Sequence, residues 1–188
     1  MTWVFGALPQ HAYSVILADP PWKFKTYTAI DGPKAPAQHY PVMTLAQLKA
    51  LPVARLAAKH CALAMWATAP MLPEALDLMA CWGFAFKTMG AWAKMSPTGK
   101  GWAFGTGYIY RSASEFYIVG TIGHPMVINR DVRNLICAPT REHSRKPDAM
   151  AYNLEQLYPY GRRVELFARA LRPKWDVWGN EITKFVAA

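Results

Sequence analysis

The chain has 188 residues, 53% of them hydrophobic, which is enough for a substantial core, so residues 1–188 are expected to form a single domain. A formal net charge of +9 indicates a polyanionic partner, most often nucleic acid, although many basic proteins bind none. Neither a signal peptide nor a membrane span is expected. Met1 to Gln10 lacks a basic start, and no window of about 18 residues is uninterrupted apolar sequence.

The cysteines and histidines give no sign of a metal or disulfide framework. Cys61, Cys81 and Cys137 lie among apolar neighbours and form no CxxC pair. We expect three buried free thiols in a reducing compartment, with no disulfide and no zinc site. His143 lies in a polar, basic stretch without companions at metal-ligand spacing, so no metal site is expected.

Residues 13–18 form a short, uncharged, β-rich run that predicts a buried strand. Asp19, Pro20, Pro21 and Trp22 follow it directly and predict a stiff turn at its carboxyl end, where open α/β sheets bind ligands. The Asp19 carboxylate and a proline carbonyl can accept both hydrogens of an exocyclic amine, while Trp22 or a nearby aromatic stacks on the base. The alternative is a strand-end turn with a capping Asp and a core-edge Trp.

Residues 23–39 have no periodicity and predict a long loop beside this turn. We interpret it as a substrate-contacting flap in which Lys23, Lys25 and Lys34 can bind phosphates. A solvated mobile loop is an equal alternative.

Helices are expected on both sides of the second strand. Thr44 can cap a helix that runs to Leu51, and Pro52 restarts it as far as Lys59. Pro70 to Trp82 predicts an amphipathic helix ended by Gly83. Its predicted apolar face consists of Leu72, Leu76 and Met79. The strands predicted in this half and the next are 61–66, 84–93 (imperfect around Gly90), 115–121 and 134–138.

Residues 96–107 form a second long loop, rich in glycine and flanked by cations. Lys94, Lys100 and Arg111 lie in or beside it, and Trp102 and Phe104 stand between its glycines. Interleaved basic and aromatic residues suit stacking on a single-stranded or flipped base. Aromatic side chains that fold back on the domain are the alternative.

The final third of the chain contains a helix and two polar strand ends. Pro147 suits the first turn of a helix, with Met150, Leu154 and Leu157 as its apolar stripe. Arg145 and Lys146 precede its N-terminus, which favours a bound carboxylate or phosphate.

Strands predicted at 163–169 and 174–178 end in Arg169 and in Asn180-Glu181, which can hydrogen-bond a ribose and a base edge. No G-x-G-x-x-G or Walker loop is present, so neither dinucleotide nor triphosphate chemistry has its usual signature.

Four motifs, in this order, resemble the MT-A70 family of adenine N6-methyltransferases. They are Asp19-Pro20-Pro21-Trp22, Ser144-Arg145-Lys146-Pro147-Asp148, Glu165-Leu166-Phe167-Ala168-Arg169 and Trp178-Gly179-Asn180-Glu181. The similarity runs from about Tyr13 to Ile182, and the compact length resembles the bacterial and phage branch. It implies an α/β, class I, Rossmann-like fold that uses S-adenosylmethionine (SAM). The implied motif order is permuted, and the central, mostly parallel sheet is flanked by helices.

The resemblance also implies roles for individual residues. The catalytic residues would be Asp19, Pro20, Pro21 and Trp22. The cofactor-binding residues would be Asp19, Lys146, Glu165, Phe167, Arg169, Asn180 and Glu181. With Tyr40 matching a site-proximal tyrosine of the family, the expected substrate-binding residues are Lys23, Lys25, Tyr40, Lys94, Trp102, Arg111, His143 and Arg145. Leu171 and Arg172 depart from the family, whose larger members offer a His-Asn pair there.

The function implied is methyl transfer from SAM to N6 of adenine in nucleic acid, with DNA preferred over RNA, by a cytoplasmic protein of bacterial or phage origin. Three alternatives remain: an RNA adenine N6-methyltransferase, a non-catalytic nucleic-acid-binding partner subunit, or a SAM-dependent enzyme acting on a small molecule or protein amide. The intact tetrad, together with Lys146 and Asn180, argues against the non-catalytic alternative. A homodimer would suit a one-domain enzyme that must grip a duplex.

Overall fold

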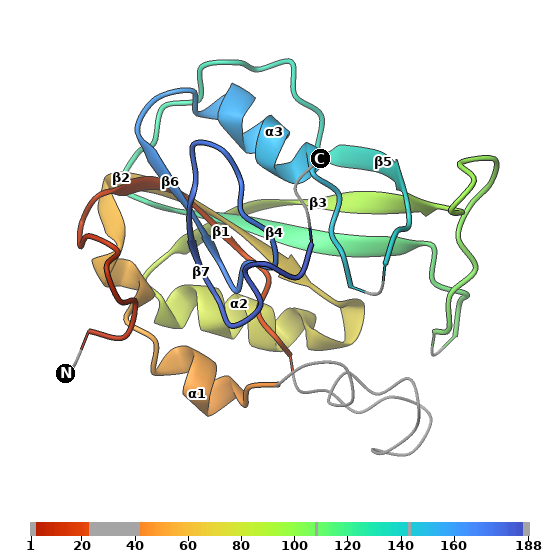
Figure 1. Cartoon of the computed structure of the whole chain (residues 1–188), viewed down its shortest axis with the longest axis horizontal. Helices are drawn as coiled ribbons and strands as arrows, with labels where there is room; N and C mark the ends of the chain where they lie inside the picture. The colour runs from red at the N-terminus through yellow and green to blue at the C-terminus, as the bar shows by residue number, and fades with distance from the viewer. Residues whose placement is uncertain (1–2, 23–41, 108, 143, 186–188) are drawn as a thin grey trace.

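The computed structural model describes residues 3–22, 42–107, 109–142 and 144–185, which build a seven-stranded sheet with helices on both faces (Figure 1). The strands are β1 (Tyr13–Ala18), β2 (Ala57–Ala67), β3 (Ala85–Met95), β4 (Ser114–Ile122), β5 (Leu135–Pro139), β6 (Arg162–Leu166) and β7 (Asp176–Trp178). The α-helices are α1 (Leu45–Lys49), α2 (Leu72–Cys81) and α3 (Ala149–Leu157), and the 3-10 helices are η2 (Val53–Arg55) and η3 (Ala69–Met71).

The sheet has the strand order β5-β3-β4-β2-β1-β6-β7. Every neighbouring pair is parallel except the two that β4 makes, with β2 and with β3. The sheet is therefore mostly parallel, as expected for the Rossmann-like fold. Because β4 runs the opposite way, its first residues lie at the same edge as the carboxyl ends of β1, β2 and β6.

Strand β1 is central because both of its faces are covered. Ile16 and Ala18 pack into the core on one face, which α1 and α2 complete with residues such as Leu48 and Leu78. Val15 and Leu17 pack into the core on the other face; its further members include Met150 and Leu154 of α3. Figure 1 shows α3 on the opposite side of the sheet from α1 and α2. No helix among the described residues is long and apolar enough to span a membrane.

Most of the predicted elements are confirmed. The capping role of Thr44 is confirmed, since its Oγ1 accepts the backbone N–H of Gln47 at 3.3 Å and Gln47 Oε1 accepts the N–H of Thr44 at 2.8 Å. The predicted helix over residues 53–59 is wrong after Arg55, because Ala57 already pairs with Tyr13 in the sheet. Pairing in the sheet here overrides the helix propensity of the alanines.

Three predictions about burial are also corrected. Leu76 is exposed, because α2 turns Ala75, Leu78 and Met79 toward the core instead. Cys81 is exposed at the end of α2, and Cys137 is exposed because β5 is an edge strand that buries only Ile136. Cys61 is a buried free thiol as predicted, and burial raises its pKa to about 12.

Candidate active site

The turn Asp19-Pro20-Pro21-Trp22 leaves β1 at the centre of the sheet edge. The N–H of Asp19 donates to Leu166 O at 3.3 Å, which ties this exit to the end of β6. Pro20 O accepts the N–H of Trp22 at 2.8 Å, and Pro21 O accepts that of Met43 at 2.9 Å. These bonds fix the turn, and the carbonyl of Pro20 keeps a second lone pair.

Trp22 supports this turn from within the core. Its side chain is buried, and Nε1–H donates to Trp66 O at 3.2 Å. The ring therefore presents no face to a base, in contrast to the stacking role considered for it. A base that stacks at this site needs another aromatic residue.

A chain of ion pairs starts at Asp19. The Nζ atom of Lys146 lies 3.1 Å from Asp19 Oδ1 and 2.9 Å from Glu115 Oε1, and Lys94 Nζ lies 2.8 Å from Glu115 Oε2. All four side chains are mostly buried, and their formal charges cancel. Asp19 is therefore held against a fixed cation, supplied by the loop that precedes α3.

Lys146 and Glu115, the two inner members of this series of ion pairs, keep their charge. Burial alone would lower the pKa of Lys146, but Asp19 and Glu115 outweigh it and raise that pKa above its ordinary value. Burial would raise the pKa of Glu115, but Lys146 and Lys94 outweigh it and lower that pKa to about 2. The site thus holds a permanent ammonium beside Asp19.

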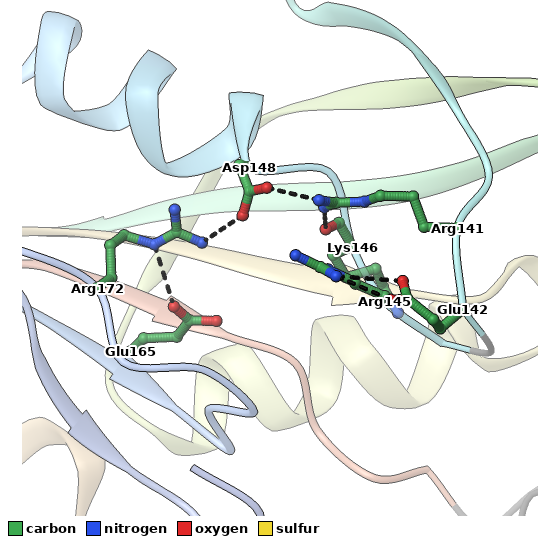
Figure 2. Close-up of polar contacts among 7 residues, drawn as sticks. All are labelled: Arg141, Glu142, Arg145, Lys146, Asp148, Glu165 and Arg172. Carbon is green, nitrogen blue, oxygen red and sulfur yellow. Dashed lines mark hydrogen bonds and ion pairs between the residues drawn. The ribbon is translucent and has the colours of Figure 1, made fainter. Parts of the chain in front are cut away.

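A second network lies beside the first and ties the loop before α3 to β6. Figure 2 shows Asp148 between Arg141, which donates from 2.7 Å, and Arg172, which donates from 3.1 Å. Nε of Arg172 also lies 3.6 Å from Glu165 Oε2, and Arg141 donates to the backbone carbonyl of Lys146 at 2.6 Å. Burial would raise the pKa of Asp148, but the two arginines lower it overall. The backbone that carries Lys146 is thereby fixed from two sides.

At Glu165, unlike at Glu115, burial affects the pKa more than the neighbouring cation does. Burial raises the pKa of Glu165 to about 6, because Arg172 offsets only part of the desolvation and the nearby Asp19 adds repulsion. A carboxyl group poised near neutrality at a ligand-facing strand end is typical of functional sites.

Two adjoining pockets open at this edge and share Asp19, Phe167 and Arg169 in their walls. The first pocket is completed by residues that include Lys146, Pro147, Asp148, Glu165 and Arg172. The second is completed by residues that include Pro21, Trp178, Asn180 and Glu181. The structure thus gathers the residues expected to bind cofactor around one continuous site.

Phe167 reaches both pockets through an unusual backbone conformation. Its φ of 61° lies in the left-handed region, where a non-glycine residue costs about 1–3 kcal/mol. Gly179 packs directly against this turn, since a Cβ there would lie 2.6 Å from Ala168 O. The glycine lets the β7 exit approach closely, which brings Asn180 beside Phe167 in the pocket wall.

The residues expected to bind substrate are spread over several elements. Lys23, Lys25, Tyr40 and His143 lie outside the described residues. Lys94 pairs with Glu115, and its Nζ lies 4.9 Å from the centre of the Trp92 ring, so it belongs to the series of ion pairs that ends at Asp19. Arg145 lines the first pocket and pairs with Glu142 at 3.0 Å. Trp102 and Arg111 project from the connection between β3 and β4, and Trp102 is exposed.

Four site residues were not among the predicted ones. Glu115, Arg141 and Asp148 organise the Lys146 loop, and Arg172 occupies a position noted only as a departure from the family. Glu115 could have been suspected, because it is a lone acid at the start of an otherwise uncharged strand. Nothing in the sequence pairs Asp148, at the N-terminus of α3, with Arg172 in the connection between β6 and β7; the two meet only in the folded chain.

The sequence of this chain is similar to the sequences of several known methyltransferases. The chain is 32% identical to the type II methyltransferase M.MunI of Mycoplasma sp., over 95% of this chain and 82% of that protein. It is 28% identical to the N(6)-adenine-specific methyltransferase METTL4 of Homo sapiens, over 92% of this chain but 38% of that protein. It is 27% identical to the N(6)-adenosine-methyltransferase subunit METTL3 of Danio rerio, over 90% of this chain and 28% of that protein.

The MT-A70 family model matches residues 13–181, a span that contains all four motifs and every residue of both ion-pair networks. With the strand-end tetrad, the lysine before α3 and the two pockets in place, the chain belongs to the MT-A70 family.

Proposed function

We propose that this chain transfers a methyl group from SAM to N6 of adenine, with DNA as its preferred polymer. One observation carries the proposal: Asp19 lies in the wall shared by two pockets, with a charged lysine fixed against it. Family membership supports the reaction class. M.MunI, of similar length, is named a type II methyltransferase, which favours the compact DNA-acting branch. The proposal includes a location in the cytoplasm of a bacterium or a phage-infected cell, which the similarity to a Mycoplasma protein supports.

The donor set of the site fits SAM. Lys146, Arg169 and Arg172 offer cationic groups, while Asp19 and Glu165 offer carboxylates for an ammonium, a sulfonium or ribose hydroxyls. Asn180 and Glu181 add amide and carboxylate groups at the second pocket. When bound, SAM supplies an electrophilic methyl group on a sulfonium, which is a good leaving group.

The protein's own contribution is orientation and electrostatics. The Asp19 carboxylate and the Pro20 carbonyl accept the two hydrogens of the adenine amine, which aims the nitrogen lone pair at the methyl group. Lys146 holds Asp19 in place by pairing with Oδ1. No proton has to leave before attack, because the methylated amine can lose one afterwards.

The test is methyl transfer from labelled SAM to single-stranded DNA, duplex DNA and RNA of matched sequence, followed by nucleoside analysis. We expect N6-methyladenine, chiefly in DNA, and a loss of about 100-fold or more in Asp19→Asn. Asp77→Asn, which removes an acid from the exposed face of α2, is the matched control and should transfer normally.

Each other result has a distinct meaning. Preference for RNA would replace DNA with RNA in the proposal. SAM binding without transfer to any polymer would instead identify a partner-dependent subunit or an enzyme with another acceptor. Transfer that survives Asp19→Asn would refute the assigned role of Asp19.

A further inference from the structure

The connection between β3 and β4, residues 96–113, rises directly from the candidate active site. Lys94, one residue before the end of β3, pairs with Glu115, the second residue of β4. Glu115 in turn pairs with Lys146, which pairs with Asp19. The base of this extension is therefore linked to Asp19 by three successive ion pairs. In Figure 1 the extension projects beyond the sheet at the far end of β3 and β4.

Backbone hydrogen bonds give the extension a defined shape. Ala103 N–H donates to Lys94 O at 2.8 Å, close to the base. Gly105 and Ser112 exchange two bonds, of 2.9 and 3.2 Å, that close a tip loop whose described residues are 106, 107 and 109–111. A loop pinned at both ends loses less conformational entropy on binding than a free one.

The tip loop exposes large apolar side chains. Ile109 is 89% exposed and Tyr110 is 86% exposed, the highest fractions among large hydrophobic residues of the described chain. Phe104, just below the tip, is 79% exposed. A cluster of exposed apolar side chains at one projection is typical of a surface that a partner covers.

The charge of the extension indicates what that partner is. Residues 96–113 include Lys100 and Arg111 and no acid, and the Arg111 guanidinium lies 5.1 Å from the centre of the Phe104 ring. A polyanion complements these cations. A second copy of this chain would bring the same cations and its own net charge of +9 against them.

We propose that the tip loop is a wedge that enters duplex DNA beside the target adenine, with Ile109 and Tyr110 as the inserted side chains. This inference rests on the proposed function. A paired adenine must leave the base stack to reach Asp19, and apolar side chains inserted between bases stabilise the opened duplex. Lys100 and Arg111 contact the phosphates that flank the opening. The wedge is thus needed for paired substrates and not for single strands.

The experiment compares three DNA substrates that carry the site found by mapping methylation in the expression host. They are the paired duplex, the same duplex with an abasic site opposite the target adenine, and the single strand. The variant Ile109→Ser/Tyr110→Ser should lose about tenfold or more in kcat/KM on the paired duplex, recover most of it on the abasic duplex, and match the parent on the single strand. Tyr160→Ser is the control, because Tyr160 is 75% exposed at the opposite end of β6.

A second readout needs no methyl transfer. With 2-aminopurine at the target position, the parent and Tyr160→Ser should increase its fluorescence in the paired duplex, and the wedge variant should not. An equal loss on all three substrates, or no loss, would overturn the wedge. A shift from dimer to monomer in sedimentation caused by the wedge variant would overturn it too, and would assign the tip loop to self-association. A parent that methylates no polymer would refute the proposed function and the wedge with it, whereas a parent and a wedge variant that methylate the paired duplex equally well would overturn the wedge alone.

Discussion

Lys146 and Asp19 form an ion pair with an Nζ–Oδ1 distance of 3.1 Å, with side chains only 18% and 16% exposed. Lys146 comes from the loop before α3 and Asp19 from the end of β1, so the pair joins two of the four family motifs. Glu115 completes it from β4, which carries no motif. The position of the carboxylate that we propose holds the adenine amine therefore depends on a residue outside the motifs.

Glu115→Gln is expected to destabilise the protein and to slow methyl transfer. The change removes the carboxylate that lies between Lys94 and Lys146 and leaves one net positive charge among the buried groups. Removing one partner from a buried ion pair costs about 3–5 kcal/mol, and transfer should fall at least about tenfold because Lys146 is no longer fixed against Asp19. Urea denaturation and initial rates measure the two effects. If Glu115→Gln is no less stable than Asp77→Asn on the surface, the ion-pair chain does not stabilise the site.

The same residue gives a pH dependence with a definite sign. The pKa of Glu115 is about 2 in the folded protein, against an ordinary value of 4.5. Its contribution to the free energy of unfolding is therefore complete above about pH 4.5 and is lost as the pH falls toward 2. The parent should lose stability over this range more steeply than Glu115→Gln, as acid titrations of both proteins would show. Parallel curves would contradict the lowered pKa.

Glu165 should give the stability of the protein a pH dependence of the opposite sign. Its pKa of about 6 lies above the ordinary value of 4.5, so the folded state binds the proton more tightly than the unfolded state. The resulting stability is complete below about pH 4.5 and is lost as the pH rises through 6. It amounts to about 2 kcal/mol. Relative to Glu165→Gln, the parent should thus become less stable between pH 4 and pH 7 by about this amount, as measured by urea denaturation. A difference that grows with pH would show that Arg172 outweighs burial.

Arg172→Lys should not preserve the second network. A lysine has no planar fork with which to reach Asp148 and Glu165 at once, as the arginine does at 3.1 and 3.6 Å. We expect a loss of about 1–3 kcal/mol in stability and weaker binding of SAM, measured by calorimetry, because the Lys146 loop and β6 are no longer joined. Arg162→Lys is the control, since Arg162 pairs with Asp176 at the exposed opposite end of β6. A lysine variant with parental SAM affinity would show that the network is dispensable for the cofactor.

The sequence predicts the site residues that follow strands better than it predicts the ion pairs between them. Asp19 follows a short apolar run and Asn180 follows the short strand predicted at 174–178, so their place at strand ends could be predicted from local pattern and from the family resemblance. The partners of Lys146 depend on strand order, because β4 reaches the site only by running antiparallel between β2 and β3. Local pattern carries no information on that pairing. For the same reason the sequence predicts Lys94 in or beside a loop, although it lies in β3 and pairs with Glu115 of β4.

Gly90 shows a similar limit within one strand. A glycine in a strand pattern favours a bulge, and the sequence predicts an imperfect strand there. In the structure β3 continues through Gly90, whose partner in β4 is Tyr117. A Cβ at this position would collide with the Tyr117 hydroxyl and with the backbone carbonyl of Asn134. The glycine thus makes room for a side chain from the neighbouring strand.

Gly90→Ala is accordingly expected to destabilise the fold although alanine is a conservative change. The added methyl group must displace the Tyr117 ring, which packs edge-on against Trp66 with centroids 5.4 Å apart, or the backbone of residue 134. Overpacking of this kind costs about 1–3 kcal/mol. Gly101→Ala is the matched control, because nothing lies within 4 Å of a Cβ there, and its stability should stay within about 0.5 kcal/mol of the parent. Urea denaturation of both variants separates the two outcomes. Equal stability would mean that β3 and β4 move apart at no cost, and that the close approach of Tyr117 is not what requires glycine.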